Sequence, residues 1–164
     1  MRRRSDGSVT LETVMFLPVM LLLIVGMIQF GKITYTYYAL HNVVYTAARY
    51  LSVQRGTNFC DPGDPNITAA INFAVTGTTD ASGTPLISNL TPDMLQVTTE
   101  CIVNGAVSVC DTSGCAISPS LAARPDYVAV TIPNGYLMTP RLPFTTLTPI
   151  QFAPTALVPF GGTQ

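Results

Sequence analysis

The chain has 164 residues, of which 48% are hydrophobic and 10% are charged, and its formal net charge at pH 7 is −1. From Ile33 onward seven acidic residues stand against four basic ones, without a basic cluster, so nucleic-acid binding has no electrostatic support. The length allows one membrane span, a helical extension and one further small domain of about 110 residues.

The first feature in chain order is an uncharged segment of nineteen residues, Thr13–Gly31, which lies between Glu12 and Lys32. As a helix it would reach about 28 Å, close to the ~30 Å thickness of the hydrocarbon core of a bilayer. Three arginines at positions 2–4 precede it, and the positive-inside rule then places the N-terminus in the cytoplasm and the rest outside. A secretory signal peptide is the alternative, but it would need a shorter apolar core and a small-residue cleavage site.

We expect the helix to continue beyond the membrane to about Gln54, because neither Pro nor Gly occurs between Lys32 and Gly56. Three tyrosines in 35–38 would form an aromatic belt at the outer interface. An apolar stripe follows at spacings of three and four and needs a partner surface, from this chain or from a neighbouring subunit; it comprises Leu40, Val43, Val44, Ala47, Ala48 and Leu51.

Turn-forming residues then introduce a second, shorter helix. The segment 55–66 is dense in Gly, Pro, Asp and Asn and is predicted to be a loop. Asp64 would cap a helix that begins at Pro65, runs to about Thr76 and stops at Gly77. The following residues, 77–92, are small and polar, and we expect an exposed loop there.

The last part of the chain has the pattern of an antiparallel sheet. Residues 94–103 and 106–110 flank Asn104-Gly105, a strong signal for a two-residue hairpin. Residues 127–132 form a third predicted strand, and 150–160 offer short or edge pieces because three prolines interrupt them. The predicted fold class is α+β: a long N-terminal transmembrane helix followed by a small exterior domain with a short helix and an antiparallel sheet.

All four cysteines lie in the part predicted to be outside, where disulfides persist: Cys60, Cys101, Cys110 and Cys115. Three pairings are possible. We favour Cys110 with Cys115, which enclose a short turn, and Cys60 with Cys101. A structural zinc site is the alternative, although the chain contains no CxxC pair.

Catalytic motifs do not stand out in the sequence. It has no Gly-rich phosphate loop and no GxSxG motif, and its single histidine, His41, lies in the predicted helix, where a surface or packing role is expected. We therefore expect no enzyme activity, no catalytic residue, no cofactor, no metal and no small-molecule substrate. A surface low in charge suits packing against copies or partners.

The start of the helix carries the most specific pattern. Glu12 stands at the edge of the apolar segment, where a carboxylate needs a partner or headgroup depth, near the positive end of the helix dipole. This region resembles the TadE-like proteins, pilin-like subunits of the tight-adherence (Flp, type IV) pilus system. The features that carry the resemblance are the arginine run, Gly7, Glu12, Pro18, the GxxxFG pattern of 26–31 and the segment 39–49. The resemblance covers about the first 50 residues well and the last 40 loosely.

The resemblance implies a prepilin leader, residues 1–7, which a prepilin peptidase would remove after Gly7 to expose Ser8. Residues 8–54 would then be the transmembrane and extended pilin helix, and 55–164 the exterior pilin-like domain. Glu12 would pair with the new ammonium group on its own or an adjacent subunit and serve assembly. Pro18, which removes one backbone donor, would bend or locally open the helix.

The predicted function is that of a pilin, minor pilin or pseudopilin that assembles through its N-terminal helix for surface attachment. Its partners would be the prepilin peptidase and other pilin subunits, in a homo- or hetero-oligomeric filament. It would occupy the bacterial inner membrane first and the cell surface once assembled. The alternative is a single-pass, membrane-anchored envelope protein that carries a non-catalytic binding module.

Overall fold

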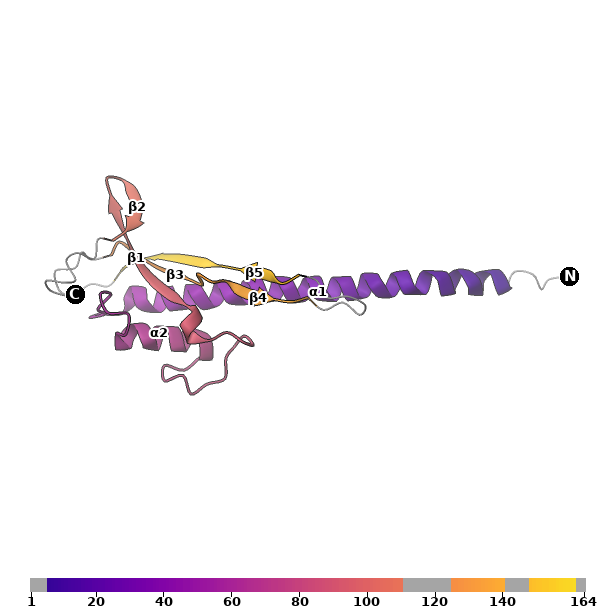
Figure 1. The fold of residues 1–164 in the computed structure, drawn as a ribbon, viewed down its shortest axis with the longest axis horizontal. Helices are drawn as coiled ribbons and strands as arrows, with labels where there is room; N and C mark the ends of the chain where they lie inside the picture. Colours follow the sequence, from indigo (N-terminus) through magenta and orange to yellow (C-terminus); the bar gives the residue numbers. More distant parts are fainter. Residues whose placement is uncertain (1–5, 111–124, 141–147, 162–164) are drawn as a thin grey trace. The chain divides into compact units, whose positions relative to one another are not determined.

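The long N-terminal helix predicted from the sequence is present. The computed structural model describes residues 6–110, 125–140 and 148–161. Helix α1 runs Asp6–Val53 (Figure 1). Pro18 lies in its interior. The chain divides into two compact units: Met1–Tyr35 with Met138–Ile150 form the first, and Thr36–Leu137 with Gln151–Gln164 form the second.

Helix α2, Pro65–Thr76, has the boundaries that its capping residues predicted. The Asp64 carboxylate accepts a hydrogen bond from the Asn66 N–H at 2.8 Å, and Pro65 occupies the first turn, where a missing donor does no harm. Gly77, with a φ of 78°, ends the helix, and its N–H donates to the Phe73 C=O.

The segment between α2 and the sheet differs in part from the predicted exposed loop. Its first half is exposed and held by local hydrogen bonds, and those from Ser82 to Asp80 lower the pKa of that carboxyl. In the second half, Ile87 and Leu90 are buried. Their burial follows from the tertiary structure, since the Leu86 N–H donates to the Val75 C=O, and a short 3-10 helix, η1 (Pro92–Met94), leads into the sheet.

A four-stranded antiparallel sheet has the order β2-β1-β3-β6. Its strands are β1 (Gln96–Val103), β2 (Ala106–Val109), β3 (Tyr127–Thr131) and β6 (Thr155–Pro159). The hairpin turn between β1 and β2 is Asn104-Gly105, with φ of 54° and 79°, as the sequence predicted. Strand β6 is an edge strand, as its flanking prolines require.

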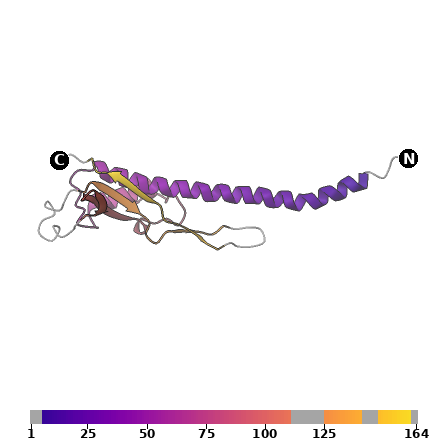
Figure 2. The same cartoon turned by 90° about the horizontal axis from the view of Figure 1, so that it is seen from above.

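The core of the second unit combines the helix stripe, α2, the loop and one face of the sheet. All six predicted stripe residues of α1 are buried, between 0% and 4% exposed. Val128 and Val130 of β3 share a sheet face with Ala156 and Val158 of β6, and these four are buried too. The yellow strand β6 lies beside the C-terminal part of α1 (Figure 2), and the Gly161 N–H donates to the Ser52 C=O at 3.0 Å. The chain's own domain therefore covers the stripe.

Two short strands pair separately: β4, Tyr136–Met138, and β5, Ile150–Phe152. The sequence prediction included β5 within 150–160 but missed β4. Gly135 precedes β4 with a φ of 62°, a left-handed backbone conformation that favours glycine, and an added Cβ would displace the Gln151 side chain. The Gln151 amide donates to the Asn134 C=O at 2.8 Å and holds the turn against β5.

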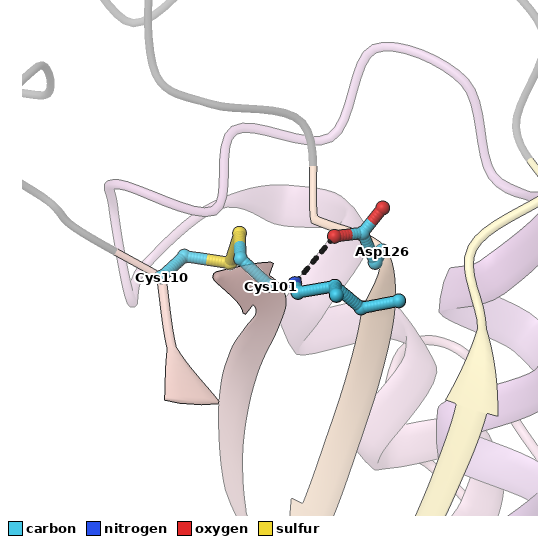
Figure 3. Close-up of a disulfide and its surroundings, with 4 residues drawn as sticks. Cys101, Cys110 and Asp126 are labelled. Carbon is cyan, nitrogen blue, oxygen red and sulfur yellow. Dashed lines mark hydrogen bonds between the residues drawn. A yellow bond between two sulfur atoms is a disulfide. The ribbon is translucent and has the colours of Figure 1, made fainter. Parts of the chain in front are cut away.

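The predicted disulfide pairing is wrong. Cys101 is bonded to Cys110, with Cα atoms 4.9 Å apart (Figure 3), and not to Cys60. The cause is the hairpin, because the Cys110 N–H donates to the Thr99 C=O at 3.0 Å and so brings Cys110 opposite the middle of β1. Cys60 is also disulfide-bonded. Cys115, the predicted partner of Cys110, lies outside the described residues.

Candidate assembly site

The N-terminal part of α1 exposes nearly all its apolar side chains. Met15 is 71% exposed and Phe30 is 72% exposed, and the most apolar window has a mean hydropathy of 2.4 with none of its residues buried. The helix is long and apolar enough to cross a membrane. A surface of this kind needs lipid or other apolar helices around it.

Glu12 lies at the head of this surface with its side chain exposed. The next charged residue in the sequence is Lys32, twenty positions later. If α1 were surrounded by water, the Glu12 carboxylate would stay hydrated and would need no partner. Inside a bilayer or a bundle of copies it would need a positive partner.

Gly7 and Ser8 lie in the first turns of α1. Because α1 begins at Asp6, the backbone on both sides of the Gly7–Ser8 bond is helical. Helix ends fray readily, so the backbone around this bond can open at low cost.

Pro18 lies six residues, or about 1.7 turns, beyond Glu12 and leaves the C=O of Val14 without its usual helical donor. The helix nevertheless continues without interruption. Farther along, a Cβ added to Gly26 or Gly31 would meet nothing within 4 Å. Both glycines therefore leave open space on the helix surface, and that space is consistent with close approach by another helix.

In the second unit α1 has two unlike faces. The stripe is buried by the domain, whereas Tyr38, Asn42, Tyr45 and Arg49 are exposed. The sequence left open whether this chain or a neighbouring subunit covers the stripe, and in the structure the stripe contacts its own chain. The face that bears Tyr38 and Tyr45 is left exposed.

An apolar groove of about 290 Å³ lies between α2 and β1 in the second unit. Phe59, Ile67 and Ile71 line one side of it, and Leu95 and Val97 line the other. The groove contains no ionisable side chain in its lining, so it offers no acid–base pair. It could accept an apolar side chain or a small apolar ligand.

The predicted site residues do not form one cluster. Glu12 and Pro18 share the N-terminal part of α1, and the described cysteines lie in the second unit. His41 is exposed. Among the residues that the structure describes, no group of three or more His, Cys, Asp or Glu side chains could hold a metal ion.

In chain order, the described residues form an exposed apolar helix, long enough to cross a membrane, and then a small α+β domain. The TadE-like protein family model matches residues 7–49, which confirms the resemblance inferred from Gly7, Glu12 and Pro18. Neither curated proteins nor solved structures yielded a match to the chain.

The family match lies within α1, so it shows a TadE-like region in the N-terminal helix and does not extend over residues 50–164. The single N-terminal apolar helix in the described residues suggests membrane anchoring.

Proposed function

We propose that the protein is a pilin or minor pilin of a tight-adherence pilus, inserted in the inner membrane and then assembled into a filament through α1. The observation that carries this proposal is the uncharged, exposed part of α1 with Glu12 at its head, inside the TadE-like match. Surface attachment by the finished filament is the corresponding biological role.

The energetics favour a helix that moves from lipid to a bundle of similar helices. Burial of one large apolar side chain stabilises by about 1.5–3 kcal/mol, and this helix exposes many of them. In water such a surface would associate without order. In the membrane, and later in a filament core, this apolar surface of α1 would contact apolar neighbours along its whole length.

Glu12 supplies the specificity in this proposal. Removal of residues 1–7 by a prepilin peptidase would give Ser8 a free ammonium group, four positions before Glu12. At low dielectric, an ammonium and a carboxylate at contact attract strongly, and an unpaired Glu12 would be costly. Between two subunits, the pair would therefore fix how far one helix is shifted along its neighbour. Within one subunit, it would neutralise the charge of Glu12.

The proposed topology follows from the charges at the two ends of the span. The N-terminal arginines would stay in the cytoplasm, and residues 55–164 would lie outside the inner membrane and later on the cell surface. The disulfide between Cys101 and Cys110 is consistent with an oxidising compartment. Residues 8–54 would form the assembly helix.

A second candidate is a membrane-anchored envelope protein whose domain binds an apolar partner. The groove between α2 and β1 favours it, because about 290 Å³ is near the lower end of ligand-pocket volumes. In this alternative α1 is an anchor only, and neither leader removal nor the charge of Glu12 matters.

Filament incorporation separates the two functions. Surface filaments sheared from cells that express the tight-adherence machinery should contain the chain, and electron microscopy with an antibody to the exterior domain should label filaments. In cells that lack the prepilin peptidase, the chain should stay in the membrane fraction. Retention of the chain in the membrane of assembly-competent cells, with unlabelled filaments, would support the anchored binding module instead.

A further inference from the structure

The hairpin formed by β1 and β2 extends beyond the rest of the four-stranded sheet (Figure 1). Strand β1 pairs with β3 only as far as Glu100, so from Cys101 onward its strand neighbour among the described residues is β2. We call residues 101–110 the hairpin finger. A two-stranded ribbon is only marginally stable by itself. The finger therefore needs clamps, a partner surface, or both.

Two contacts clamp the base of the finger. The disulfide between Cys101 and Cys110 joins its two strands. On the β3 side of β1, the Asp126 carboxylate accepts a hydrogen bond from the Ile102 N–H at 2.6 Å (Figure 3). The Asp126 N–H in turn donates to the Glu100 C=O at 3.0 Å. These contacts hold the finger in one conformation, and a preorganised element loses less conformational entropy when it binds.

The finger exposes apolar side chains on both of its faces. Ile102 and Val107 lie opposite each other in register, and each is 51% exposed. Val103, which points to the other face, is 52% exposed. No residue of the finger is charged. Because the exposed face of an antiparallel sheet is normally polar, this group of apolar side chains indicates an interaction surface.

The chain itself carries a surface with matching chemistry, the apolar groove between α2 and β1. The groove has a volume of about 290 Å³ and no ionisable side chain in its lining. The finger does not reach the groove of its own chain, because Val103 lies four residues, or about 14 Å, beyond Thr99, the last β1 residue in the lining. A second copy would supply an uncharged finger to an uncharged groove, so neither surface would bury an unpaired charge.

We propose that the hairpin finger of one copy inserts into the groove between α2 and β1 of the next copy. This inference rests on the proposed pilin function and adds a contact between exterior domains to the contact through α1. Finger and groove are different surfaces, so the contact is heterologous, and each copy in a row keeps one free finger or one free groove at its ends. Such a contact extends into an open filament when its rotation does not close a ring.

Cross-linking of introduced cysteines tests the contact. Val107→Cys places a thiol on the finger, and Gln96→Cys places one at the groove; Val103→Cys is a second finger position if the first disturbs the hairpin. Within one chain these thiols are far apart, because Ile102, the register partner of Val107, lies six residues or about 20 Å from Gln96 along β1. The described part of the chain has no free cysteine, so a short bismaleimide, which leaves disulfides intact, reports on the introduced pair.

Leu86→Cys combined with Gln96→Cys is the matched control pair, because Leu86 is an apolar residue 67% exposed outside the finger. Filaments sheared from cells and the membrane fraction of the same cells are both treated, and the full chain is followed on denaturing gels. For Val107→Cys with Gln96→Cys we expect a ladder of dimers, trimers and larger multimers from filaments. The control pair and each single variant should remain monomeric.

Each other outcome overturns a different statement. Filaments that contain the double variant but give no ladder would show that the contact is wrong while the pilin function stands. Dimers from Val107→Cys alone would show that fingers meet each other, and a band whose mass is not a multiple of the monomer would show that another protein fills the groove. Absence of the chain from filaments would refute the pilin function, and the membrane fraction then decides the contact: a ladder supports it, and monomer alone overturns it.

Discussion

The rings of Tyr37 and Phe152 meet edge to face, with centroids 5.9 Å apart and planes at 61°. Tyr37 belongs to α1 just beyond the apolar segment, and Phe152 ends β5, so the contact joins residues more than a hundred positions apart. It fixes the helix to the domain at the point where the helix would enter the membrane.

We expect Phe152→Ala and Tyr37→Ala each to lower the free energy of unfolding of the domain. In a double-mutant cycle the two changes should be coupled by about 0.5–1.5 kcal/mol, the range for aromatic pairs. Chemical unfolding of the full chain in detergent measures the coupling. Tyr35→Ala is the control, because Tyr35 is 76% exposed. A coupling of zero would mean that the ring contact contributes nothing.

The disulfide pattern can be read by mass spectrometry without reduction. Cleavage before aspartates gives a peptide 93–110 with Cys101 and Cys110, a peptide 111–125 with Cys115, and a peptide that ends at Cys60 and begins at Asp6, or at Ser8 if residues 1–7 have been removed. We expect 93–110 to be two hydrogens lighter than its reduced form. Because Cys60 is bonded and Cys115 is the only other cysteine in the chain, the remaining two peptides should be linked. A single species containing all three peptides would contradict this pattern.

Asp64 is the acid that organises the start of α2. Its carboxylate accepts the N–H of Asn66 at 2.8 Å and the N–H of Asn58 at 3.1 Å, and the residue is buried. We expect Asp64→Ala to lower the free energy of unfolding by about 1–2 kcal/mol, as for other lost helix caps. Asp64→Asn, which keeps one acceptor oxygen, should lose less.

Asp61→Ala is the matched control for this prediction. Asp61 is exposed, and its carboxylate accepts a local hydrogen bond from the Gly63 N–H at 2.8 Å. Its replacement should change the free energy of unfolding by no more than about 0.5 kcal/mol. Equal losses for the two alanine variants, measured by thermal unfolding, would show that the cap is not the reason for the effect.

The local signals in the sequence predicted most of the fold. Asp64, Pro65 and Gly77 determine the bounds of α2, and Asn104-Gly105 determines the hairpin, because caps and turns depend on a few adjacent residues. The long helix and its stripe were predicted from periodicity, which depends only on the helical repeat.

Features that depend on tertiary contacts were not predictable in the same way. The burial of Leu90 needs the loop to fold back on α2, and β4 has only three residues, too few for a period to show. The pairing of Cys101 with Cys110 follows from the ladder between two strands, which outweighs the closeness of Cys110 to Cys115 in sequence. For the candidate site, the sequence predicted Glu12 and the apolar segment but did not indicate the apolar groove between α2 and β1.

Glu12→Ala should abolish incorporation into filaments and leave the unfolding of the domain unchanged, because its side chain is exposed and belongs to the first unit. Glu12→Gln should also fail, since it keeps the size of the side chain but not the charge that the Ser8 ammonium would pair with. Asp93→Ala, which removes an exposed acid from the domain, is the charge control. Counting labelled filaments per cell gives the result, and normal piliation by Glu12→Ala would refute the assembly role.

The N-terminus of the mature chain tests the account most directly. Cells with an active prepilin peptidase should yield a membrane-extracted protein whose first residue is Ser8, and intact-mass measurement with N-terminal sequencing will identify it. In peptidase-deficient cells the same measurement should show residues 1–7 still attached. An N-terminus at Met1 or Arg2 in peptidase-competent cells would contradict processing after Gly7, and with it the pairing of Glu12 and the pilin function.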